Sequence, residues 1–476
     1  MSTSASPNKA FYRAFGLVIA GLIVGILVLA LLVTTSGPWI RQVVVQNQSG
    51  EGIASVDQGL TVVFDRPIDS TDFTNAIEVQ PKTDFTVSHR NQQLNITFNQ
   101  NLLTDTDYVL TVKPELEDNL GKQMEREYTY EFATAEPSFT YLERNYGTRV
   151  PDRVIEQMPL SQKSYVLFGA DRIKFFARNA NYLAVVLPRA DDTDELRVVD
   201  LGSREEKSVD IPPDVRIDNL KFSPVDNQFV FITRATRKGD TSESYLEDYN
   251  NQLYRYDIDG EQLQSVDTLS AKSSVANVLY ARESVLYSRD GQALLYRTLD
   301  GEFYLTGATQ TTAPVLLGKY QDSGGFDRTN TKLAFPSGSG VAIYDAQAGE
   351  TREVPDIQIG GRISTPVFLH NSDELLYLKA PLDAKPGEAL QVDAANMDGE
   401  VEEQGVDLQS QASFFGEPEL SYDDRYVLIE VTFEPQSSDD YVGDPQPKDP
   451  RLVLYDRLDG KVIDSDIRGI EPVWNR

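Results

Sequence analysis

Apolar and polar residues alternate with a period of two along most of this chain, and one uninterrupted apolar run stands near its N-terminus. Alternation with that period is typical of strands that bury one face, as at Leu94, Ile96 and Phe98. The pattern therefore predicts an all-β protein that begins with one helix.

The apolar run FGLVIAGLIVGILVLALLV extends from Phe15 to Val33 without a charged residue. Its 19 residues at about 1.5 Å each reach about 28 Å, roughly one hydrocarbon core. The run predicts a transmembrane helix within residues 15–36, with a cleaved signal peptide as the alternative. Gly21 and Gly25 form a small-xxx-small pair, which either brings two helices together or faces lipid.

Basic residues fix the expected orientation of this segment. Lys9 and Arg13 precede the run, and the next basic residue is Arg41. The positive-inside rule therefore predicts a cytoplasmic tail over residues 1–14 and an extracytoplasmic remainder anchored in the cell membrane by a single pass.

Residues 38–136 show short alternating segments separated by turn residues, as expected for two antiparallel sheets packed face to face. Three stretches, VVFDRPID from Val62, LTDTDYVLTV from Leu103 and YTYEFAT from Tyr128, resemble the bacterial Ig-like domain of surface proteins. The resemblance implies a β-sandwich that serves as a spacer or adhesion module.

An internal repeat fills residues 137–476. Six windows share a strand, a polar turn and a returning strand: FARNANYLAV (Phe176), FSPVDNQFVF (Phe222), YSRDGQALLY (Tyr287), FDRTNTKLAF (Phe326), FLHNSDELLY (Phe368) and LSYDDRYVLI (Leu420). A further strand and an Asp- and Gly-bearing turn follow most windows, as in VAIYDAQAGE from Val341. Four strands per repeat predict the blades of a β-propeller.

The windows resemble the WD40-like, TolB-type propeller repeat, in which phrases such as FSPDGxxLAF recur. The resemblance implies the fold and leaves the function open. Trp474 stands where a seventh window is due, and three strand-like segments precede the first window. We therefore expect about seven blades, with the C-terminal strand closing the ring.

Composition excludes several classes of function. The formal charge of -30 argues against nucleic-acid binding, which needs Lys and Arg to displace counterions. The absence of cysteine removes disulfides, thiolate nucleophiles and Cys-ligated metals. A large exported chain without disulfides favours a bacterial source.

No motif for catalysis is present. The two histidines, His89 and His370, have no motif support for a Ser-His-Asp arrangement, and His370 sits where the other windows carry turn residues, which predicts a surface turn. GxSxG, Walker A and HExxH are missing. We expect a protein that is not an enzyme and needs no cofactor. A glycosidase-like hydrolase that uses two propeller carboxylates stays as an alternative.

Loop lengths predict where a partner binds. In an antiparallel four-stranded blade the first and third turns share one face and the second turn lies on the other. The insertions fall at the second turn, and they carry the candidate contact residues Tyr245, Glu247, Asp248, Tyr249, Asp439, Asp440 and Tyr441. We expect this acidic rim to bind an envelope protein or a glycan, with solvated insertions as the alternative.

Two acidic runs in the same insertions are candidate calcium ligands: Asp191, Asp192 and Asp194, and Asp439, Asp440 and Asp444. Carboxylate oxygens suit calcium, but neither run has EF-hand spacing. The expected function is thus a membrane-anchored, extracytoplasmic binding or scaffold protein, with a hydrolase or a passive spacer as alternatives.

Overall fold

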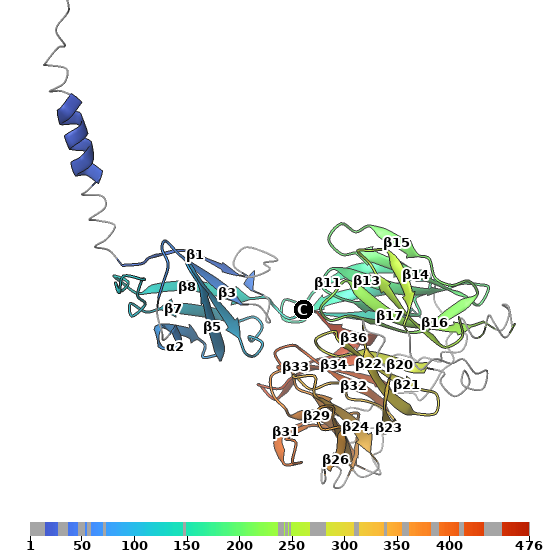
Figure 1. Ribbon diagram of the computed structural model, residues 1–476. Coiled ribbons are helices and arrows are strands. Elements are labelled where there is room, and N and C mark those ends of the chain that lie inside the picture. The colour runs from blue at the N-terminus through green and yellow to red at the C-terminus, as the bar shows by residue number, and fades with distance from the viewer. Residues whose placement is uncertain are drawn as a thin grey trace, which may run out of the picture. The chain divides into compact units, whose positions relative to one another are not determined.

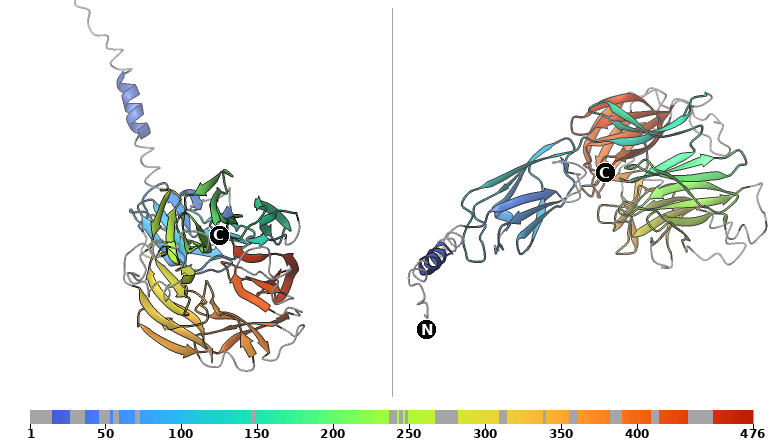
Figure 2. Two further views of the ribbon diagram at one scale, coloured as in Figure 1. Left: turned by 90° about the vertical axis from the view of Figure 1, so that its right-hand side faces the viewer. Right: turned by 90° about the horizontal axis from the view of Figure 1, so that it is seen from above.

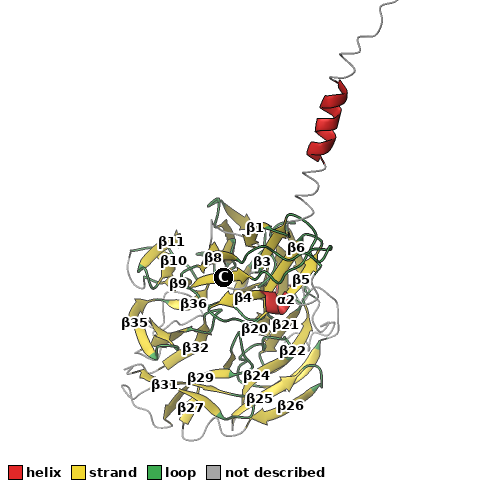
Figure 3. Cartoon of the chain, turned by 90° about the vertical axis from the view of Figure 1, so that its left-hand side faces the viewer, coloured by secondary structure: helices red, strands yellow, loops and turns green. Residues whose placement is uncertain are grey.

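The computed structural model describes most of the chain. The described residues are 15–26, 37–45, 53–54, 59–69, 73–145, 149–236, 242, 246, 249–266, 282–308, 314–337, 340–354, 361–381, 390–408, 414–432 and 450–475. The chain divides into two compact units, Met1–Ala135 and Glu136–Arg476. Nearly all their described elements are strands (Figure 3).

The predicted fold class is wrong in its transmembrane helix. The described helix covers residues 15–26 (Figure 1). Among the described residues, no helix has the length and apolar character needed to cross a membrane. Phe15, Gly21 and Gly25 lie in this helix, and Val33 lies outside the described residues. The single-pass anchor predicted from the run is therefore corrected.

The rest of the first unit forms two four-stranded sheets, with strand orders β1-β3-β6-β5 and β2-β8-β7-β4. Its elements are β1 (Ile40–Val45), β2 (Ile53–Ala54), β3 (Leu60–Phe64), α2 (Phe73–Ala76), β4 (Ile77–Gln80), β5 (Phe85–Arg90), β6 (Gln93–Phe98), β7 (Asp107–Val112) and β8 (Tyr128–Thr134).

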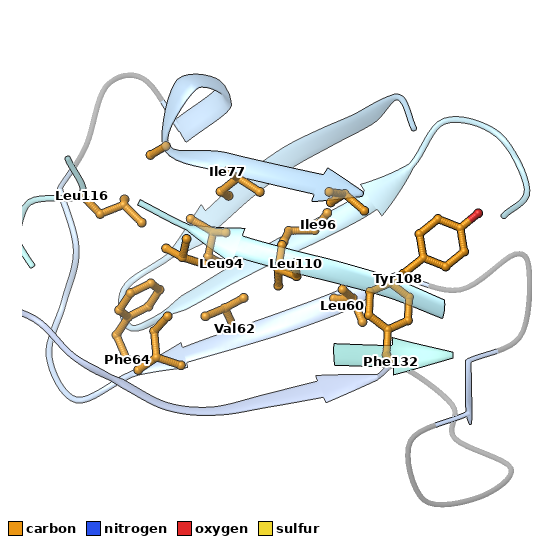
Figure 4. Close-up of a cluster of buried hydrophobic side chains, with 14 of the residues drawn as sticks. Leu60, Val62, Phe64, Ile77, Leu94, Ile96, Tyr108, Leu110, Leu116 and Phe132 are labelled. Carbon is orange, nitrogen blue, oxygen red and sulfur yellow. The ribbon is translucent and has the colours of Figure 1, made fainter. Parts of the chain in front are cut away.

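Alternate residues of these strands form one apolar core between the two sheets (Figure 4). Leu60, Val62 and Phe64 of β3 point inward, as do Leu94 and Ile96 of β6. The period-two pattern of the sequence thus corresponds to one buried and one solvated face per strand.

The second unit contains seven described sheets, which we number as blades 1 to 7. Blade 1 comprises β36 (Ile470–Trp474), β9 (Phe139–Glu143), β10 (Asp152–Met158) and β11 (Lys163–Ala170). Blade 2 comprises β12 (Phe175–Arg178), β13 (Tyr182–Pro188), β14 (Asp194–Asp200) and β15 (Glu206–Val209). Blade 3 comprises β16 (Val215–Phe222), β17 (Gln228–Ala235), β18 (Gln252–Asp257) and β19 (Gln262–Ser265). Blade 4 comprises β20 (Arg282–Tyr287), β21 (Ala293–Thr298), β22 (Glu302–Gly307) and β23 (Val315–Lys319).

The remaining blades follow in chain order. Blade 5 comprises β24 (Lys332–Ser337), β25 (Gly340–Asp345) and β26 (Glu350–Val354). Blade 6 comprises β27 (Gly361–Ile363), β28 (Val367–Phe368), β29 (Leu375–Pro381), β30 (Leu390–Ala395) and β31 (Val401–Leu408). Blade 7 comprises β32 (Phe414–Leu420), β33 (Tyr426–Thr432), β34 (Arg451–Asp456) and β35 (Lys461–Arg468).

Apolar clusters join each blade to the next and make the seven sheets a ring (Figure 2). Representative pairs, starting between blades 1 and 2 and ending between blades 7 and 1, are Val154 with Val185, Val186 with Phe229, Val230 with Tyr296, Leu295 with Phe335, Ala334 with Tyr377, Leu376 with Ile429, and Leu428 with Phe139. Successive residues of the second strand enter opposite clusters, which explains why these strands are continuously apolar.

Blade 1 contains both ends of the repeat region. The C-terminal strand β36 pairs with β9, with Trp474 opposite Phe139 and Ile470 opposite Leu142. As predicted, the last residues therefore supply the first strand of a blade whose other strands come from the start of the repeats. The chain thus forms a closed β-propeller.

Candidate binding site

One face of the propeller carries its long second connections. Residues 189–193, 236–251, 382–389 and 433–450 each join the second strand of a blade to the third. Because these strands pair antiparallel, the strand ends that the four connections join all lie on the same face of the ring. We call this face the rim.

The three acidic residues of the first rim connection do not converge. Asp191 Oδ1 accepts hydrogen bonds from the backbone N and Oγ1 of Thr193, which lower the pKa of Asp191. Asp192 pairs with Arg216 at 3.3 Å. Asp194 is buried in β14, and burial raises its pKa even though Lys174 Nζ lies 3.1 Å from Oδ2. Within the described ranges no group of three acidic or histidine residues is arranged to hold a metal ion.

Most other predicted contact residues lie outside the described residues. They are Tyr245, Glu247, Asp248, Asp439, Asp440, Tyr441 and Asp444. Tyr249 is described, and it packs against the core between blades 2 and 3 while its backbone oxygen accepts a hydrogen bond from Thr233 Oγ1 at 2.7 Å. The aromatic ring of Tyr249 therefore contributes to the core.

Two cavities follow the axis of the ring, of about 360 Å³ and about 370 Å³. They share lining residues, among them Lys221, Arg289, His370 and Glu419. Together they form a polar channel, which is where propellers of this kind offer a concave site.

The first cavity, which we call the acidic cavity, contains three carboxyl groups: Asp322, Glu417 and Glu419. The carboxyl groups of Glu417 and Asp322 lie within hydrogen-bond reach of each other. Burial and the charge of Asp322 raise the pKa of Glu417 well above its usual range, although solvent in the channel reaches the side chain. Burial also raises the pKa of Glu419, against the opposing charge of Lys221.

The second cavity, which we call the basic cavity, opens among the first connections of the blades, on the face opposite the rim. Its cations are Arg178, Lys221 and Arg289. Arg289 donates to the backbone oxygens of Phe368 and Leu369, and its Nη1 lies 3.1 Å from His370 Nδ1. His370, which the sequence places in a surface turn, is half-buried here.

The sequence analysis missed this channel, although a signal for it exists. The residue directly before the opening residue of five of the six windows lines the acidic cavity: Lys221, Leu286, Gly325, Val367 and Glu419. Charged residues at such a position, in a strand otherwise buried, mark the wall of an axial channel.

The family profile of the bacterial Ig-like domain matches residues 35–134. The first unit is a bacterial Ig-like domain. The match agrees with the sandwich described above, and it confirms the resemblance inferred from the sequence. No curated protein matches the chain in sequence.

Solved structures that resemble the chain contain propellers. A chain from a study of two prolyl endopeptidases aligns with a TM-score of 0.50 at 12% identity, over 69% of this chain and 49% of that one, so this chain spans about half its length. TolB from Acinetobacter baumannii aligns with a TM-score of 0.37 at 14% identity over 68% of this chain and 78% of its own. A putative TolB from Agrobacterium tumefaciens aligns with a TM-score of 0.37 at 17% identity, over 58% of this chain and 90% of its own. The propeller predicted from the repeats is the fold described above, and at these identities the likeness to solved structures concerns the fold alone.

Proposed function

We propose that this bacterial protein is an extracytoplasmic binding protein whose propeller rim docks a protein with a basic surface. The observation that supports the proposal is the position of the four long connections, which all leave one face of a rigid ring. Functional residues concentrate on such loops because the scaffold holds them while their sequences vary. The formal charge of -30 favours a basic partner. The Ig-like domain acts as a spacer.

The test is a cross-linked pull-down from bacterial envelope extract with the full chain. Val431 of β33 pairs directly with Arg451 of β34, so a two-residue Asn-Gly turn can replace residues 432–450 without disturbing the ladder. A partner that the intact chain enriches and the trimmed chain loses supports the proposal. The matched control keeps the loop length and changes Asp439, Asp440 and Asp444 to Asn, which separates the effect of charge from that of shape.

Both variants must melt at the temperature of the parent chain. If the trimmed chain retains the same partner, this connection of the rim does not bind that partner. A partner that the neutral loop also retains contradicts the electrostatic part of the proposal. If no protein is enriched, the proposal of a protein partner fails, and a glycan ligand or a spacer role takes its place.

A carboxylate-dependent hydrolase is the second candidate, and the Asp322–Glu417 pair is the observation that favours it. Its geometry fits poorly, because glycosidases hold their two carboxyl groups about 5 to 10 Å apart and these two hydrogen-bond directly. A screen of polysaccharides for turnover tests this candidate. Turnover that Glu417→Gln abolishes would support the hydrolase over the binding protein.

A further inference from the structure

The basic cavity lies on the ring axis and receives residues from six blades. Its wall includes Asn475 from blade 1, Arg178 from blade 2, Lys221 from blade 3, Arg289 from blade 4, His370 from blade 6 and Tyr422 from blade 7. Its volume of about 370 Å³ lies within the range of small-molecule sites. A ligand here would touch most of the ring at once.

The charge of this cavity is opposite to that of the chain. Its lining contains three cations, Arg178, Lys221 and Arg289, against two carboxylates, Asp226 and Glu419, a balance of +1. The whole chain carries -30. Cations gathered in a concave site in this way attract an anion, because low-dielectric walls focus the field.

Arg178 is a preorganised part of the wall. Its side chain is only 7% exposed, and two contacts fix it: Nη1 donates to Thr140 Oγ1 at 2.6 Å and Nε to the backbone oxygen of Asn179 at 3.2 Å. The nearest carboxylate, Glu156, lies 3.5 Å from Nη1. Burial lowers the pKa of Arg178, which shows that its charge costs energy in this place.

Lys221 is the more accessible cation. Its side chain is solvated within the channel, and among the described residues it forms no ion pair within 4 Å. Its charge acts at longer range on Glu417 and Glu419. Because the pKa of Glu417 is raised well above its usual range, its carboxyl group neutralises Lys221 less than an ionised carboxylate would.

Neutral polar groups complete the wall. Four asparagines line the cavity: Asn179, Asn181, Asn227 and Asn475. Three of these amides, those of Asn179, Asn227 and Asn475, hydrogen-bond within the protein. The exposed amide of Asn181 offers both donors and an acceptor, which is what neighbouring hydroxyl groups of a sugar require. The rings of His370 and Tyr422, with centroids 5.2 Å apart and planes tilted by 39°, add aromatic surface against which a sugar face can pack.

We propose that the basic cavity binds a saccharide bearing carboxylate groups, with a carboxylate near Arg178, Lys221 and Arg289 and hydroxyl groups toward Asn181. The site is separate from the rim, because first and second connections lie on opposite faces of the ring. A peptide carboxylate would satisfy the cations, but it would offer no hydroxyl groups to Asn181 and no sugar face to the rings of His370 and Tyr422. The observations therefore favour a uronate-type oligosaccharide.

Isothermal titration of the full chain with tri-mannuronate tests the proposal, with mannotriose as the uncharged control of equal length. We expect binding of the uronate only, weakened at least tenfold by Lys221→Met and restored by Lys221→Arg, because one charge-assisted contact contributes about 1.5 to 3 kcal/mol. Raising the salt from 50 to 300 mM should also weaken binding. Lys207→Met, which removes an exposed lysine that pairs with Glu261, is the matched control and should leave the affinity unchanged.

Several results would overturn the proposal. Equal binding of mannotriose, or uronate binding that Lys221→Met leaves intact, removes the role of the cations. If tri-mannuronate does not bind at millimolar concentration, the basic cavity is not a uronate-binding site. Binding of acetyl-trialanine in place of the uronate assigns the cavity to a peptide carboxylate. The rim experiment is independent of each result, because its variants change residues on the other face.

Discussion

Gly324 lines the acidic cavity at the point where the inner segments of blades 5 and 6 approach each other. A Cβ atom at this position would lie 1.5 Å from the backbone oxygen of Pro366. The backbone N of Gly324 donates a hydrogen bond to the backbone oxygen of Ala334 at 2.9 Å, which holds the segment in place. Backbone cannot move aside as a flexible side chain can. Glycine is therefore required here by close approach rather than by its dihedral angles.

We expect Gly324→Ala to lower the free energy of unfolding by about 3 kcal/mol, as overpacking of a rigid site does. Gly169→Ala is the control, because its Cβ would meet only Asp152 O at an ordinary 3.7 Å. Thermal melts of both variants measure the difference. Equal melting temperatures would show that blades 5 and 6 separate easily at this point.

Single residues were the level at which the sequence predicted least. The carboxylates of Asp191, Asp192 and Asp194 are close in sequence, yet one caps a turn, one pairs with an arginine and one points into the core. Alternation of side chains along a strand sends Asp194 inward. The sequence predicted no role for the channel residue Lys221, because only the closed ring brings it near residues far away in the sequence, such as Glu419.

At the scale of elements, the closing strand β36 has the most direct consequence. Trp474 is 4% exposed, its Nε1 donates to Glu419 O at 2.9 Å, and its ring packs edge-on against Phe139 at 5.4 Å. It therefore joins blade 1 to blade 7, at the junction where the two ends of the repeat region meet.

We expect Trp474→Ala to cost about 3 to 5 kcal/mol of unfolding free energy, as other buried tryptophans do. The chain has two tryptophans, and Trp39, which is 56% exposed, supplies the control. Trp39→Ala should change stability by less than about 0.5 kcal/mol. Chemical denaturation followed by circular dichroism compares them, and similar midpoints would mean that the ring is stable without its closing strand.

Elements were predicted well where the pattern was periodic. The windows mark hairpins because their turn residues and apolar triplets recur, and the position of Trp474 followed from the spacing alone. The apolar run from Phe15 occurs once, so no repeat of its pattern supports the prediction made from it. Its composition predicted a span, whereas no helix among the described residues is long and apolar enough to cross a membrane.

At the scale of the whole molecule, buried carboxyl groups make stability depend on pH. Burial raises the pKa of Asp194, Glu417, Glu419, Asp424 and Glu430. For Asp424 the value rises from 3.8 to about 6, although the backbone amides of His370 and Asn371 donate to it. A raised carboxyl pKa means that the folded state binds more protons than the unfolded state in the window between the two values.

The unfolding free energy should therefore fall as the pH rises from about 4 to about 6. For Asp424 a pKa difference of about 2 corresponds to about 3 kcal/mol, or about 4 °C in the melting temperature of a unit of this size. The repulsion among the -30 charges of the chain acts in the same direction, since it also grows with pH. We expect the propeller to melt several degrees higher at pH 5 than at pH 7.5, as measured by differential scanning calorimetry.

Asp424→Asn isolates the contribution of that group, because the amide cannot ionise. The variant should lose stability at pH 5, where one of the two backbone amides loses its acceptor, and should show a flatter profile between pH 4 and 6. A parent chain that gains stability from pH 5 to 7.5 would contradict the expected sign of this pH dependence. It would mean that the exposed carboxylates with lowered pKa, such as Asp200 and Asp459, outweigh the buried ones.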